Sequence, residues 1–72
     1  MLTNLKNELT HKQISVKAFA DFLGVSEKTA HNKLSEKTDF TYPEVKRTSQ
    51  FLFPEYNLEY LFWSDYEQKN LS

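Results

Sequence analysis

The chain has a single glycine, Gly24, and this residue lies between two stretches with helical apolar spacing. In the first stretch, Val16, Phe19, Ala20 and Leu23 follow the i, i+3, i+4, i+7 pattern of an amphipathic helix. Glycine adopts positive φ without a Cβ clash, so it is the residue that ends a helix in a sharp turn. The sequence therefore predicts two short helices joined by a tight turn at Gly24.

Hydroxyl residues mark the expected helix starts. Ser15, Ser26 and Thr41 each follow an apolar residue and precede a helical pattern, which is typical of an N-cap with a hydrophobic staple. Glu44 completes a capping box with Thr41. Asn57 is the expected N-cap of a last helix over residues 58–63.

The remaining apolar positions complete the expected fold. Leu2, Leu5 and Leu9 indicate a first helix, and Val45, Ser49 and Leu52 indicate the inner side of a fourth helix, with Phe51 flanking it and Pro54 ending it. No segment has the alternation of a strand. We predict an all-α, compact five-helix bundle over residues 1–63, followed by a polar C-terminal tail over 64–72.

Composition excludes several classes of function. The chain has no cysteine and no apolar run of the ~20 residues that a bilayer requires. Its N-terminus lacks the pattern of a signal peptide, so we expect a cytoplasmic location and no membrane partner. His11 and His31 have no partner at ligand spacing, and Ser26 with His31 lacks a third group to orient a base. We therefore expect no enzyme activity, no metal, no cofactor and no small-molecule substrate.

Charge is distributed unevenly along the chain, whose net charge is −1. Residues 1–39 have six lysines and five acidic residues, whereas residues 40–72 have three basic and five acidic residues. A surface that binds nucleic acid needs positive charge. If the chain binds DNA, the binding surface is expected in its first half.

The segment from Ser15 to Leu34 has the layout of a helix-turn-helix, in which the second helix enters a major groove. The motif Phe19-Ala20-x-x-Leu23-Gly24-Val25-Ser26 resembles the signature of lambda-repressor-like (Cro/CI or XRE-type) DNA-binding domains. The resemblance continues through Asn32-Lys33, Phe40-Thr41 and residues 58–62, and is closest to small regulators of phages and mobile elements. It implies a sequence-specific repressor that places helix 27–35 in the major groove of double-stranded DNA.

This sequence departs from the family pattern at two places. Val16 stands where many members have a glutamine that bonds a phosphate, and Leu34-Ser35-Glu36 replaces the usual Glu-Asn-Gly after the recognition helix. The first departure removes one anchor to DNA, and the second leaves the course of the following loop open.

Helix geometry predicts which side chains face DNA. At about 100° per residue, Lys28 and Asn32 lie opposite the inward residues Ala30 and Leu34. Lys28 can donate to guanine and Asn32 can pair with adenine, while Thr29 can touch a thymine methyl group or a phosphate. Glu27 can accept from cytosine N4 or stabilise its own helix end, and we favour the second role. The predicted contacts to the DNA backbone are Ser15, Lys17, His31, Lys33 and Lys37.

Because the predicted DNA-binding surface has few cations, we expect one monomer to bind DNA with modest affinity. We therefore expect a homodimer that binds two half-sites about 34 Å apart. Tyr60, Phe62 and Trp63 are the predicted dimer contacts, with core packing as the alternative for these aromatic residues. A protein-interaction adaptor with the same fold is the alternative function. The absence of net positive charge and the valine at position 16 favour that alternative.

Overall fold

The computed structural model describes residues 1–64, and every regular element in that range is helical. The elements are α1 (Thr3–His11), α2 (Val16–Leu23), α3 (Glu27–Leu34), α4 (Tyr42–Arg47), the π-helix η1 (Thr48–Leu52) and α5 (Leu58–Leu61). For residues 1–64 this confirms the prediction of an all-α fold with five helices, when α4 and the η1 that continues it are counted as one. Residues 65–72 of the predicted tail, with Tyr66 among them, lie outside the described residues.

The predicted N-caps form. In each case the cap side chain accepts a hydrogen bond from the backbone N–H three residues on, at Ser15, Ser26, Thr41 and Asn57. At Thr41 the capping box is complete, since Glu44 Oε1 accepts from the Thr41 backbone N–H at 2.9 Å. These bonds satisfy donors that have no partner inside a helix, which is why the helix starts could be read from the sequence.

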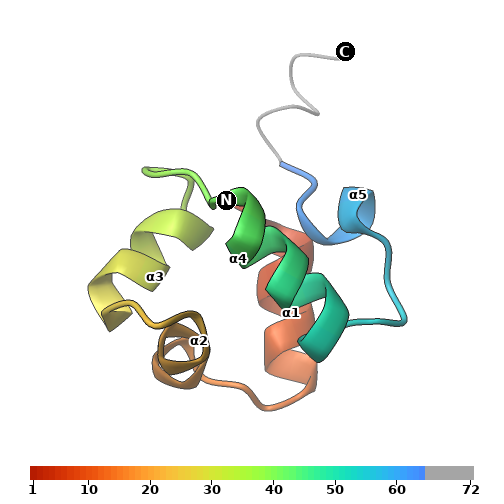
Figure 1. Cartoon of the computed structure of the whole chain (residues 1–72), viewed down its shortest axis with the longest axis horizontal. Coiled ribbons are helices and arrows are strands. Elements are labelled where there is room, and N and C mark those ends of the chain that lie inside the picture. Colours follow the sequence, from red (N-terminus) through yellow and green to blue (C-terminus); the bar gives the residue numbers. More distant parts are fainter. Residues whose placement is uncertain (65–72) are drawn as a thin grey trace.

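The core is built mainly from the first three helices together with Phe53 and Leu61. Its fully buried side chains include Leu5 and Leu9 of α1, Phe19 of α2, Leu34 of α3 and Leu61 of α5. Figure 1 shows α3 at one edge of the molecule and α5 at the opposite side, with α1 and α4 between them. The last helix ends at Leu61, two residues before the predicted end at residue 63.

The fourth helix differs from the prediction of a continuous α-helix. From Thr48 onward it is a π-helix, closed by a hydrogen bond from the Phe53 backbone N–H to the Thr48 carbonyl at 3.2 Å. A π turn holds more residues than an α turn, so the inward positions shift. Thr48 and Phe53 are fully buried, whereas Phe51 points outward and is 72% exposed.

The hydroxyl of Thr48 is buried and has no hydrogen-bond partner within residues 1–64. An unsatisfied buried polar group is destabilising, so Thr48→Val, which has nearly the same shape, is expected to raise the free energy of unfolding by about 1 kcal/mol. Urea unfolding measures the change, and Thr38→Val on the exposed loop is the control with little expected effect. A loss of stability in Thr48→Val would contradict this account of the hydroxyl.

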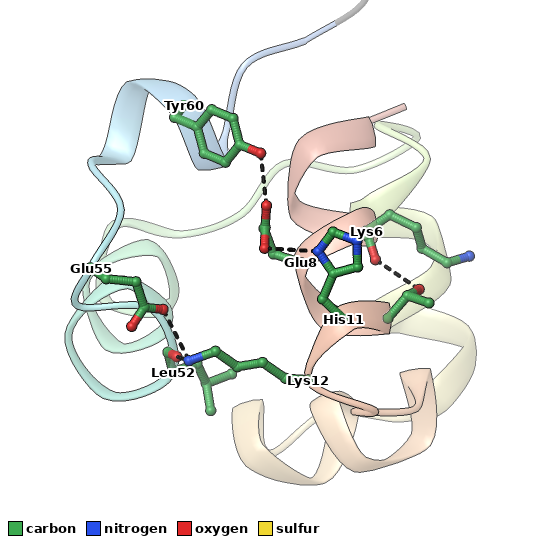
Figure 2. Close-up of polar contacts among 8 residues, drawn as sticks. Lys6, Glu8, His11, Lys12, Leu52, Glu55 and Tyr60 are labelled. Atoms are coloured by element: carbon green, nitrogen blue, oxygen red, sulfur yellow. Dashed lines mark hydrogen bonds and ion pairs between the residues drawn. The ribbon is translucent and has the colours of Figure 1, made fainter.

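Polar contacts join α1 to the C-terminal part of the chain (Figure 2). Glu8 is buried, and its carboxylate accepts from the Tyr60 hydroxyl at 2.8 Å and lies 3.3 Å from His11 Nδ1. Lys12 Nζ donates to the Leu52 carbonyl at the end of η1. These contacts fix α5 and the end of η1 against α1.

The Tyr60 hydrogen bond is the main reason that the pKa of Glu8 lies below its ordinary value, although burial opposes the shift. A lowered pKa in the folded state stabilises the fold above the unfolded-state pKa, and the stabilisation is lost as pH falls through the folded-state value. We therefore expect the free energy of unfolding to decrease on acidification below pH 4.5, the ordinary value for this group. Glu8→Gln is expected to flatten this decrease in urea unfolding measured across the acid range, and an unchanged slope would contradict it.

Candidate nucleic-acid interface

The turn between α2 and α3 is built around Gly24, whose φ of 78° and ψ of 30° lie in the left-handed region. Two backbone hydrogen bonds close the end of α2, from Gly24 N–H to the Ala20 carbonyl at 2.8 Å and from Val25 N–H to the same carbonyl at 3.0 Å. Ser26 then caps α3. In Figure 1, α2 is seen nearly end-on while α3 runs across the view, so the two helices cross steeply.

The backbone conformation of Gly24, and not lack of space, requires glycine, because a Cβ placed there would meet no atom within 4 Å. Gly24→Ala is therefore expected to lower the free energy of unfolding by about 1 kcal/mol, since alanine is disfavoured in the left-handed region. Gly24→Asn should lose less, because asparagine tolerates this region. Chemical denaturation of both variants measures the difference, and equal losses would show that the conformation is not the cause.

The outward side of α3 has two polar side chains that find no partner in the described part of the chain. Ala30 and Leu34 are buried, while Lys28 is exposed and Asn32 is half-buried. Within residues 1–64, the side chains of Lys28 and Asn32 make no hydrogen bond or ion pair. The backbone carbonyl of Asn32 accepts from the Lys37 N–H at 2.9 Å and so anchors the loop after α3.

Two other predicted base contacts already interact within α3. The Thr29 hydroxyl accepts from Ser26 Oγ at 2.9 Å, so it is part of the N-cap arrangement. Glu27 Oε2 lies 3.8 Å from His31 Nε2, one turn along the helix, and both side chains are exposed. Glu27 thus has a partner on its own helix when His31 is protonated, and its carboxylate lies in the first turn, as the helix-end role requires.

The structure places Lys33 differently from the prediction of a phosphate contact. Lys33 is only 8% exposed, and its ammonium lies 2.9 Å from Glu44 Oε1 and donates to the Asp39 carbonyl at 3.0 Å. Burial disfavours the charge of Glu44, but hydrogen bonds from the Thr41 backbone and from Lys33 outweigh it and hold the pKa of Glu44 below its ordinary value. The Lys33 ammonium therefore pairs inside the fold, and we correct the prediction.

The position of Lys33 on its helix did not by itself indicate this role. On a helical projection Lys33 and His31 both border the buried side defined by Ala30 and Leu34, and only the contact with Glu44 of α4 distinguishes Lys33. Lys12 also has a partner within the chain, although at the surface, because its ammonium lies 3.0 Å from Glu55 Oε1 and 4.9 Å from the centre of the Phe53 ring. Sequence reasoning gave neither lysine this role.

The remaining predicted backbone contacts are on the surface. Ser15, Lys17 and Lys37 are exposed, and Ser15 Oγ accepts from the Ala18 N–H at 3.0 Å. Among residues 1–64, the ammonium groups of Lys17 and Lys37 have no acidic partner. These cations, together with Lys28, lie on α2, on α3 and on the loop after α3.

The predicted dimer contacts also pack within the molecule. Tyr60 is 38% exposed, stacks on Tyr56 with ring centres 5.2 Å apart and bonds to Glu8 through its hydroxyl. Phe62 is half-buried, with its ring edge-on to Phe40 at 5.2 Å, and Trp63 is half-buried. Much of the surface of Phe62 therefore packs within the fold, as the alternative of core packing predicts.

In the part of the chain that the structure describes, no helix is long and apolar enough to cross a membrane. Comparison with protein-family models, with curated proteins and with solved structures found no match to this chain.

Proposed function

We propose that this chain is a sequence-specific regulator that binds double-stranded DNA, with α2 and α3 acting as a helix-turn-helix of the lambda-repressor type. The observation that carries the proposal is the outward side of α3, where Lys28 and Asn32 have no partner within residues 1–64. The turn at Gly24 supports it, because it lets α3 begin as a separate helix at the edge of the molecule (Figure 1).

In this proposal α3 enters the major groove. Lys28 donates to O6 or N7 of guanine, and the Asn32 amide pairs with N6 and N7 of adenine, where a good bidentate pair discriminates by about 1–3 kcal/mol. Thr29 lies beside these residues and Glu27 stabilises the helix start. The protein then represses by occluding the site, without catalysis.

Contacts to phosphate set the orientation on DNA. Ser15 and Lys17 at the start of α2 and Lys37 after α3 are the proposed anchors, and His31 adds a donor when it is protonated. With so few cations, occupancy in a cell requires a second copy on an adjacent half-site. Tyr60, Phe62 and Trp63 remain the proposed dimer contacts through the parts of their surfaces that are exposed.

The test is an anisotropy titration with a labelled duplex from upstream of the protein's own gene, against a random duplex, at two salt concentrations. Binding to the upstream duplex should be at least about a thousandfold tighter than to random DNA, as in specific complexes. The logarithm of the binding constant should also fall linearly with the logarithm of the salt concentration, with a slope of about −0.9 for each phosphate that the protein neutralises. Equal binding to both duplexes at low salt would reject the proposal.

One observation favours the adaptor as the second candidate. Lys12 pairs with Glu55 on the surface and Lys33 pairs with Glu44 in a largely buried contact, so the charges of two of the six lysines of the first half are neutralised within the chain. Retention on heparin together with the mass in solution separates the two functions. A monomer that does not bind heparin would favour the adaptor, whereas retention that depends on Lys17 and Lys28 would favour DNA binding.

A further inference from the structure

The outward side of α4 and η1 is a second surface, distinct from α3. We call it the α4 face and define it by the exposed residues Tyr42, Lys46, Arg47, Gln50 and Phe51. The other side of the same helix turns inward, where Thr48 is buried and Val45 and Leu52 are partly buried. Residues four apart on a helix are neighbours, so Lys46 lies one turn from Tyr42, and Phe51 lies one turn beyond Arg47.

Two aromatic rings mark the ends of the α4 face. Tyr42 and Phe51 are each 72% exposed, more than any other large hydrophobic side chain among residues 1–64. Other rings of this small fold pack against one another, as Phe40 does with Phe19 and Phe62. Phe51 points outward because the helix widens at Thr48. An aromatic ring left in water is apolar area that a partner can bury.

The side chains between these rings are positively charged. Lys46 and Arg47 are exposed, and neither makes an ion pair within residues 1–64. Glu44 is the one acidic residue between 42 and 52, and it turns inward to Lys33. The α4 face thus has two adjacent cations on a chain whose net charge is −1.

We propose that the α4 face docks an acidic segment of another protein, one in which apolar side chains lie among carboxylates. Carboxylates of the segment pair with Lys46 and Arg47, and its apolar side chains cover Tyr42 and Phe51. A DNA backbone would satisfy the cations but leave both rings in water. The α4 face of a second copy would repel the α4 face of the first, since both are positively charged. This surface is additional to the proposed DNA-binding side and does not depend on it.

The probe for the test is a synthetic peptide of glutamate with interspersed leucine and tryptophan, blocked at both ends and titrated into the ¹⁵N-labelled chain. We expect backbone shifts confined to α4 and η1, and binding that K46E/R47E weakens at least about tenfold through like-charge repulsion. K46E/R47E should instead bind a peptide of the same sequence in which lysine replaces glutamate. K17E/K28E, a matched double reversal on α2 and α3, should bind the acidic peptide as the unmodified chain does.

Three outcomes would overturn the proposal. The first is equal binding by K46E/R47E or by a peptide with glutamine in place of glutamate. The second is a dimer in sedimentation equilibrium that Phe51→Ser dissociates, because a second copy would then occupy the face. The third is a loss of DNA affinity in K46E/R47E that equals the loss in K17E/K28E. Lys46 and Arg47 would then contact phosphate. Failure of DNA binding in the unmodified chain would reject the proposed function and leave the α4 face untouched.

Discussion

Lys33→Met is expected to lower the free energy of unfolding by about 3 kcal/mol, the lower end of the range for breaking a buried ion pair. Methionine keeps the apolar part of the side chain beside Phe40, whose ring centre lies 5.8 Å from the ammonium. It removes the charge that neutralises Glu44, and both members of this pair are largely buried. Urea unfolding at neutral pH measures the loss.

Two comparisons make this prediction specific. Adding Glu44→Gln should restore most of the stability, because glutamine keeps the capping box with Thr41 and needs no counter-charge. Lys37→Met, on the exposed loop, should change stability by less than about 0.5 kcal/mol. If Lys33→Met were as stable as Lys37→Met, or if it lowered the salt dependence of DNA binding, the corrected role of Lys33 would be wrong.

Asn32→Ala and Lys28→Ala are expected to relax sequence preference on DNA, each by about 1–3 kcal/mol at one base position. Lys17→Ala is expected to weaken binding to all duplexes alike and to reduce the salt slope by about 1, because Lys17 is a proposed phosphate contact. Titration of each variant with a preferred duplex and its single-position variants separates the two effects.

The matched control for Asn32→Ala is Gln50→Ala, which removes an exposed side-chain amide from η1 and should leave both affinity and preference unchanged. Folding is checked by thermal unfolding, since the Asn32 backbone carbonyl, and not its side chain, anchors the following loop. If all three α2–α3 variants lost affinity equally across sequences, the assignment of the groove-facing side would be wrong.

Local rules predicted much of the fold. The caps at Ser15, Ser26, Thr41 and Asn57 depend on a side chain and the backbone three residues on, so the sequence alone contains both partners. The conformation of Gly24 is equally local. Lys28 and the neighbouring polar residues could be placed on the outer side of their helix because helical periodicity fixes it once Ala30 and Leu34 are buried.

Features that depend on distant residues were missed. The pairing of Lys33 with Glu44 joins two helices, and the hydrogen bond between Tyr60 and Glu8 joins the two ends of the fold. The π-helix at Thr48 has no local signature, because burying Phe53 depends on how the end of this helix meets α1. In each case tertiary packing decides between arrangements that the local sequence allows.

The most direct test of the central claim is an NMR spectrum of the ¹⁵N,¹³C-labelled chain bound to its preferred duplex. The account predicts intermolecular contacts from the side chains of Lys28 and Asn32 to base protons in the major groove. It also predicts shifts at the start of α2, around Lys17. A bound spectrum in which α3 is unperturbed, with contacts only from α4 or α5, would contradict it.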